Sequence, residues 1–293
     1  MTAAARIRRL TPYLLVGPPI LLLFALVAYP MLYNIVLSLR NYRTGEFVGL
    51  HNFARVFDDA IFLSSIKATL TYIVLAVGIE LVAGLGLALF IHRKVPSGLV
   101  RSLLYLLMIL PMVTPPVAAG VIARLMYTPN YGIINLALRG AGLIDRDIEW
   151  LSTAPTAMFS VLSVDIWQWM PFVFLVAFAG LQAVPQDIVE AAKSDGAGGW
   201  HLFRYIEFPY LQSLLLLVLV FRVTDTFRVF DHVLVLTGGG PGSATEFLSV
   251  YLYRVAFKFF DLSYAAAISF YILAAASVVF TLLQRWLVTE AVM

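Results

Sequence analysis

The chain has 293 residues, of which 61% are hydrophobic and only 13% are charged, and its mean hydropathy is +0.89. Soluble domains are nearer half apolar, and the 20 basic and 17 acidic residues are too few to cover a water-soluble fold of this length. The expected solvent is therefore a lipid bilayer. The net charge of +3 is small and the basic residues are scattered, which argues against nucleic acid as a partner. The absence of cysteine excludes disulfides, thiolate metal sites and a thiol nucleophile.

The N-terminus resembles a signal peptide in charge but not in length. Arg6, Arg8 and Arg9 precede an apolar run from about Leu14 to Val36. That run is longer than the h-region of about 7–15 residues in a signal peptide, and no A-x-A site closes it. We expect a signal-anchor helix that is retained.

Long apolar stretches dominate the rest of the chain. A transmembrane helix needs about 20 mostly apolar residues. Backbone groups in lipid must be satisfied within the segment, so such stretches are helices, and an outer-membrane barrel would show short alternating segments instead. The predicted fold class is all-α, a polytopic membrane bundle of six transmembrane helices at about 12–37, 66–91, 101–127, 156–183, 211–236 and 263–288.

The distribution of basic residues predicts the orientation of the bundle. Cytoplasmic loops carry an excess of lysine and arginine. The N-terminal tail and the loop from His92 to Arg101 have basic residues without an acid, whereas the first two opposite loops mix both signs. Both termini and the loop 184–210 are therefore expected in the cytoplasm, and the loops 38–65, 128–155 and 237–262 outside.

A polar, charged loop lies between the fourth and fifth apolar stretches, over residues 190–209. Gly196 is placed to end one short helix and begin another at an angle. Trp200, Phe203 and Ile206 then recur at about helical spacing and predict an apolar edge. Such a loop presents a folded surface to a partner in the aqueous phase.

The two ends of this loop also carry positional signals. Glu190 is expected near a helix N-terminus, where a negative charge is favoured. Pro209 is expected to stop the segment before the next span. Without the residue spacing, an amphipathic hinge that only joins two spans is the favoured interpretation.

The spacing of Glu190-Ala191-Ala192, Gly196 and Ile206-x-Phe208-Pro209 resembles the EAA loop of permease subunits of bacterial ABC importers. The departure is Phe208, where leucine is usual. The resemblance implies a type I ABC importer permease fold and a coupling helix that sits in a cleft of a cytoplasmic ATPase subunit. The implied coupling residues are Glu190, Ala191, Ala192, Gly196, Trp200, Phe203, Ile206 and Pro209.

A second stretch, from Phe230-Asp231 through Leu236-Thr237-Gly238-Gly239-Gly240-Pro241-Gly242, looks like the carbohydrate-type permeases of the maltose and glycerol-phosphate importers. Its glycines do not form a nucleotide-binding loop, because no Lys-Ser/Thr pair follows and no strand precedes them. The residues alone predict a flexible outward loop. The resemblance implies that this loop contacts an extracytoplasmic binding protein.

The resemblance covers nearly the whole chain and implies the rest of an assembly. Residues 1–293 would form a single transmembrane domain in the bacterial inner membrane, next to a second homologous permease subunit. Two ATPase subunits would use ATP and Mg²⁺, while this chain binds no cofactor itself. An extracytoplasmic solute-binding protein would deliver a sugar or related polyol.

Charged residues within a span are costly and usually face a partner or a cavity. Arg222, Asp225, Arg228 and Asp231 follow at intervals of three residues, so they could pair along one helical face. They form either a ladder of ion pairs or a polar wall for a solute. The resemblance implies that Arg222, Asp225 and Thr226 occupy positions where maltose-type permeases touch sugar. Glu80, alone in the second span, is expected to bond within the bundle.

The fourth span carries a polar and aromatic group. Aromatic faces stack on sugar rings while amides and carboxylates bond hydroxyl groups, so the mixture suits a polyol; an aromatic belt with ordinary packing is the alternative. The residues are Asp165, Trp167, Gln168, Trp169 and Met170. In the third span, Pro111, Pro115 and Pro116 predict a kinked helix.

Motifs for chemistry are absent from the sequence. The four histidines stand apart with no H-E-x-x-H, so neither a metal site nor a catalytic residue is predicted, and no G-x-S-x-G elbow is present. Two rivals remain: a secondary transporter driven by an ion gradient, which would often show an inverted repeat, and an intramembrane enzyme using Asp165 or Asp225, which would need a paired catalytic motif.

Overall fold

The computed structural model describes residues 13, 15–96 and 98–292. The arginine-rich tail and the predicted start of the first span at residue 12 lie outside the described residues. Within them, regular structure is helical apart from one isolated antiparallel bridge between Arg40 and Phe47. Five of the described helices are long and apolar enough to cross a membrane, and a bent helix pair counted as one span makes six. The all-α membrane bundle is confirmed.

The chain divides into two compact units. One comprises Met1–Asp59 and Leu252–Tyr271, and the other Ala60–Tyr251 and Ile272–Met293. The first unit contains the span Leu15–Ser38, in which the π-turn η1 (Phe24–Ala28) leads into α2 (Tyr29–Ser38), and then α3 (His51–Arg55) and η2 (Val56–Asp58). The organisation of residues 1–293 as a single domain stays a prediction.

Arg55 organises the polar part of the first unit. Its Nη1 donates to Oδ2 of Asp261 at 2.6 Å, and its guanidinium lies 4.1 Å from the ring centroid of Tyr264. The Tyr264 hydroxyl in turn donates to Oδ2 of Asp59 at 2.6 Å. Residues 38–59 of the predicted loop 38–65 are therefore folded around these side chains, whereas residues 60–65 are already helical.

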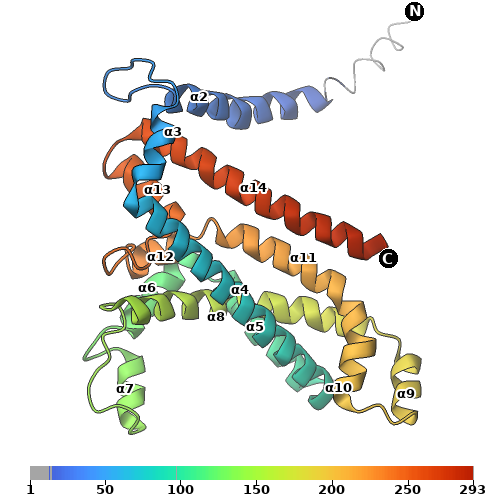
Figure 1. Cartoon of the computed structure of the whole chain (residues 1–293). Helices are drawn as coiled ribbons and strands as arrows, with labels where there is room; N and C mark the ends of the chain where they lie inside the picture. The colour runs from blue at the N-terminus through green and yellow to red at the C-terminus, as the bar shows by residue number, and fades with distance from the viewer. Residues whose placement is uncertain (1–12, 14, 97, 293) are drawn as a thin grey trace, which may run out of the picture. The chain divides into compact units, whose positions relative to one another are not determined.

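The second unit is built on α8 (Ala154–Gln182), which packs against α4 (Ala60–Lys94), α5 (Leu99–Val113) and α11 (Phe208–Thr226) (Figure 1). Small residues permit this close approach. A Cβ built on Gly84 would lie 2.7 Å from Cβ of Val173, and one on Gly180 would lie 2.6 Å from Cδ2 of Leu211.

The predicted kink of the third span is confirmed. α5 ends at Val113, α6 (Pro116–Met126) begins at Pro116, and the two helix axes differ by 97°. A break in lipid frees backbone groups that need new partners. The side chain of Gln168 supplies one, since its Nε2 donates to the carbonyl oxygen of Thr114 at 2.6 Å.

The remaining connectors of the second unit also contain helices. α7 (Ile133–Gly140) lies in the loop 128–155, where the buried Asn135 amide bonds Ile148 and the indole N–H of Trp150. α12 (Asp231–Leu236) packs on α6. α13 (Leu248–Phe257) and α14 (Leu262–Val292) follow, and each has residues in both units.

The fifth span differs from the prediction of 211–236 at both ends. The helix runs without interruption over Gly199–Thr226, through α10 (Gly199–Leu202), the π-turn η3 (Phe203–Glu207) and α11. The expectation that Pro209 stops the segment is wrong, because the wider i→i+5 turn before it relieves the crowding that proline causes in an α-helix. At the other end, the Arg228 N–H bonds the Asp225 carbonyl oxygen at 2.9 Å and closes the helix at Thr226.

Replacing Gly84 by alanine should destabilise the second unit by about 1–3 kcal/mol, because the added methyl group overlaps Val173. Gly78 on the same helix is the matched control: a Cβ there meets nothing within 4 Å, so Gly78→Ala should leave stability unchanged or raise it by up to about 1 kcal/mol. Unfolding of each purified variant in detergent measures both values. Equal stability of the two variants would contradict the packing described.

Candidate functional site

The predicted polar loop is a helical hairpin, drawn in yellow in Figure 1. α9 (Gln186–Ser194) forms its first limb, and α10 with η3 forms the second. Gly196 has φ +83°, and the Ala197 N–H donates to the carbonyl oxygen of Ala192 at 2.9 Å. This left-handed closure is the usual end of a helix that turns sharply. The predicted turn at Gly196 is confirmed.

The expectation that Glu190 lies near a helix N-terminus is wrong. Glu190 is the fifth residue of the helix, and the acidic residue in its first turn is Asp187. The error arose because the helix begins directly after Pro185, whose fixed φ suits the residue before a first turn, four residues earlier than the Glu-Ala-Ala pattern suggested. Glu190 and Ala191 are exposed, and Ala192 is half-buried.

The second limb is anchored on one side and exposed on the other. The buried carboxylate of Glu207 accepts from Nη2 of Arg93 at 2.5 Å, which ties η3 to the end of α4. Phe203 and Ile206 are half-buried, whereas 73% of Trp200 is exposed. Large exposed aromatic side chains commonly mark a protein interface. The pairing of Arg93 with Glu207 was not foreseen; the only sequence signal was one charge at each end of two apolar stretches.

A buried ion cluster lies between three helices of the same unit. Arg222, 1% exposed in its side chain, donates from Nε and Nη2 to the two carboxylate oxygens of Glu80 at 2.7 and 2.8 Å. Its Nη2 also donates to Asp165 at 2.8 Å, and its Nη1 to Asp225 at 2.9 Å. The guanidinium lies 4.7 Å from the ring centroid of Trp169. One arginine thus joins α4, α8 and α11, and the expectation that Glu80 bonds within the bundle is confirmed.

The predicted ladder of ion pairs is confirmed for Arg222, Asp225 and Arg228, which pair at intervals of three residues, but it does not extend to Asp231 among the described residues. Because α11 ends at Thr226, Arg228 lies beyond the helix, and Asp231 begins α12 as an exposed residue. Arg228, 75% exposed, donates to Oδ1 of Asp225 at 3.2 Å. Asp225, with 28% of its side chain exposed, therefore connects the buried cluster to the surface.

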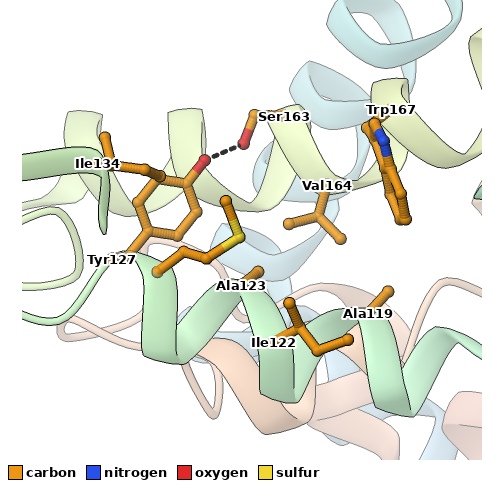
Figure 2. Close-up of a pocket in the computed structure, with 9 residues that line it drawn as sticks. Ala119, Ile122, Ala123, Tyr127, Ile134, Ser163, Val164 and Trp167 are labelled. Atoms are coloured by element: carbon orange, nitrogen blue, oxygen red, sulfur yellow. Dashed lines mark hydrogen bonds between the residues drawn. The ribbon is translucent and has the colours of Figure 1, made fainter. Parts of the chain in front are cut away.

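The aromatic and polar residues of α8 point in different directions. Trp167 lines a pocket of about 290 Å³ between α6 and α8, in which the hydroxyl groups of Tyr127 and Ser163 are hydrogen-bonded at 2.5 Å (Figure 2). Trp169 instead covers Arg222. Gln168 donates to the carbonyl oxygen of Thr114 at the break between α5 and α6. Met170 packs in the apolar core.

The predicted substrate residues are therefore brought together only in part. Arg222 contacts both Asp225 and Trp169, and the Thr226 hydroxyl donates to the Arg222 carbonyl oxygen at 2.5 Å. Trp167 belongs to a separate pocket because neighbouring positions on a helix face different ways. Among the described residues, no group of three or more His, Asp or Glu side chains could hold a metal ion.

Long apolar helices joined by a buried ion cluster, with a folded polar hairpin between two of them, define a polytopic membrane protein. Residues 80–290 match the family described as the binding-protein-dependent transport system inner membrane component, and the chain belongs to that family. It is thus a membrane-spanning permease component of the inner membrane.

Relatives and solved structures agree with this assignment. The chain is 35% identical over 271 residues to a probable ABC transporter permease of Sinorhizobium fredii, covering 90% of this chain and 85% of that protein. It is 34% identical to the trehalose/maltose transport system permease of Thermococcus litoralis, covering 85% and 83%. A crystal structure of a bacterial ABC transporter for alginate import has a TM-score of 0.84 at 23% identity and 97% coverage of both chains, which confirms the type I importer permease fold.

Replacing Arg222 by methionine should cost about 3–5 kcal/mol of stability, because three carboxylates would be left in the bundle without their common partner. Arg228→Gln is the control, since an exposed ion pair contributes about 1 kcal/mol at most. Denaturation of the purified variants compares the two losses. If Arg222→Met unfolded under the same conditions as Arg228→Gln, the cluster would not hold the helices together.

Proposed function

We propose that the chain forms half of the translocation pathway of an ATP-driven importer for a sugar or related polyol, delivered by an extracytoplasmic binding protein. The family assignment supports dependence on a binding protein over the rival driven by an ion gradient. The named substrates of two similar proteins, trehalose/maltose and alginate, support the sugar class. A second homologous permease would complete the pathway, and a pair of ATPase subunits would consume ATP with Mg²⁺.

The hairpin of α9, α10 and η3 is the proposed contact with the ATPase. The observation that carries this proposal is its combination of an exposed Trp200 with a buried anchor, the ion pair of Arg93 and Glu207. A surface that only bound a partner would need no such tie, whereas a surface that transmits force needs one. In this arrangement the hairpin and both termini lie in the cytoplasm, as the basic residues of the early loops favour.

The proposed solute contact centres on Asp225 and its neighbours. Asp225 is the most exposed acid of the buried cluster, and Arg222 orients one of its carboxylate oxygens. Arg222 itself has its Nε, Nη1 and Nη2 bonded to carboxylates, so it positions Asp225 and reaches a solute only if the cluster opens. Trp167, 48% exposed beside Ser163 and Tyr127, offers an aromatic face of the kind that stacks on sugars.

A single cysteine at Ala192 should crosslink to the ATPase subunit in the assembled transporter, since the natural chain has no cysteine to compete. Ala141→Cys, exposed in the loop 128–155, is the control and should not crosslink. Gel analysis of membranes treated with a short bifunctional thiol–amine reagent shows either product. The proposal fails if Ala192→Cys never reaches the ATPase, or if solute uptake proceeds without that subunit.

Asp225→Asn should raise the KM of solute uptake at least tenfold, equivalent to about 1.4 kcal/mol of lost interaction, because an amide accepts fewer hydrogen bonds than a carboxylate. Asp145→Asn, an exposed acid in the predicted outward loop 128–155, should leave uptake unchanged. Uptake of labelled sugar into proteoliposomes of the assembled transporter measures both. Normal uptake by Asp225→Asn would remove Asp225 from the solute pathway without affecting the coupling proposal.

A further inference from the structure

A polar cavity of about 460 Å³ lies beneath the hairpin, within the second unit. Its wall combines the end of α4, the start of α5, the end of α8, the helix α9 and η3. The cavity is distinct from the apolar pocket beside Trp167 and from the ion cluster around Arg222. Charged and polar residues form most of its lining: His92, Arg101, Gln182, Gln186, Glu190, Lys193 and Glu207.

The charges around this cavity do not balance. The carboxylate of Glu207 is already bonded to Arg93. The remaining charged residues of the lining are Arg101, Lys193 and Glu190, and none of these three forms an ion pair within the part of the chain that the structure describes. The cavity therefore keeps an excess of one positive charge.

Two buried nitrogen atoms at this wall lack a hydrogen-bond partner among the described residues: Nε of Arg101 and Nδ1 of His92. Both side chains are held in place. Arg101 bonds the carbonyl oxygen of Val95 and its guanidinium lies 5.5 Å from the ring centroid of Phe178, while the His92 ring meets the same ring edge-on at 5.9 Å. A buried donor with no acceptor costs free energy, so this wall contains two unsatisfied polar groups next to the charged lining.

The size and chemistry of the cavity restrict the kinds of molecule that can bind in it. Its volume exceeds the roughly 30 Å³ that one water molecule takes up in the liquid. A guanidinium and an ammonium group that face the same space are the groups with which proteins bind phosphate. An apolar occupant would leave these donors unsatisfied, and a cation would be repelled by the excess charge.

We propose that this cavity binds a phosphate-bearing anion, and that the bound anion clamps α9 to the adjoining ends of α4 and α5. The phosphate comes either from an anionic lipid headgroup or from a soluble phosphate compound. Binding itself is independent of the ATPase. A regulatory effect on transport rests on the proposed function, because α9 is the limb that would touch the ATPase.

The test uses the full-length chain, purified in neutral detergent and freed of lipid, with inorganic phosphate as the probe in isothermal titration. The unmodified chain should bind saturably, and Arg101→Gln should bind at least tenfold more weakly. Lys193→Gln, whose exposed side chain makes misfolding no concern, should also bind more weakly. Arg204→Gln removes a charge from the same hairpin but does not line the cavity, so its affinity should stay within twofold.

Two further measurements separate the possible sources and test the clamp. In nanodiscs, phosphatidylglycerol should abolish phosphate binding if a lipid headgroup is the natural occupant, whereas discs of phosphatidylcholine alone should not; binding that is the same in both discs assigns the site to a soluble anion. Saturating phosphate should slow amide hydrogen exchange over residues 186–207 in detergent. A cavity filled only by water would show no saturable binding and no retained anionic lipid, and equal affinity of Arg101→Gln and Lys193→Gln with the unmodified chain would equally overturn the proposal.

Discussion

The buried charge of Arg222 is the constraint on which the membrane part of this protein depends. A guanidinium among apolar helices must be neutralised and must have its N–H groups bonded, because no water is present to do either. Glu80, Asp165 and Asp225 meet that demand from three helices. The interaction therefore specifies which helices meet and in which register, something that apolar contacts alone specify weakly in a bilayer. The close approaches at Gly84 and Gly180 bring the same helices near enough for these bonds to form.

The hairpin is also attached to the bundle by an ion pair between charged side chains. In the proposed coupling role, the polar segment has to be folded by itself and attached to the bundle. Gly196 closes the first limb, and the ion pair of Arg93 with Glu207 attaches the second. The proposed anion cavity lies between that attachment and α9, so an occupant would add contacts where the structure already joins hairpin and bundle.

Much of this architecture could be predicted from sequence because it depends on local chemistry. Apolar length predicted the spans, three prolines predicted the break in the third span, and a glycine between polar residues predicted the turn of the hairpin. The partner of Glu80 could not be predicted, since Arg222 is 142 residues away and spacing reports only neighbours on one helix. The limits of the fifth helix were missed because a proline rule that assumes α-geometry does not anticipate the wider turn at Phe203–Glu207. The grouping of Trp167 and Trp169 in one site was wrong because residues two positions apart on an α-helix face roughly opposite ways.

The unbroken helix from Gly199 to Thr226 carries the second limb of the hairpin at one end and Arg222 of the ion cluster near the other. Between Trp200 and Arg222 the rise of about 1.5 Å per residue amounts to about 33 Å. A tilt of about 5° at one end would displace the other by about 3 Å, which exceeds the range over which a hydrogen bond survives. In the proposed coupling role, a displacement of that size at Trp200 would require an exchange of partners around Arg222, so the ion cluster would resist small thermal displacements of this helix.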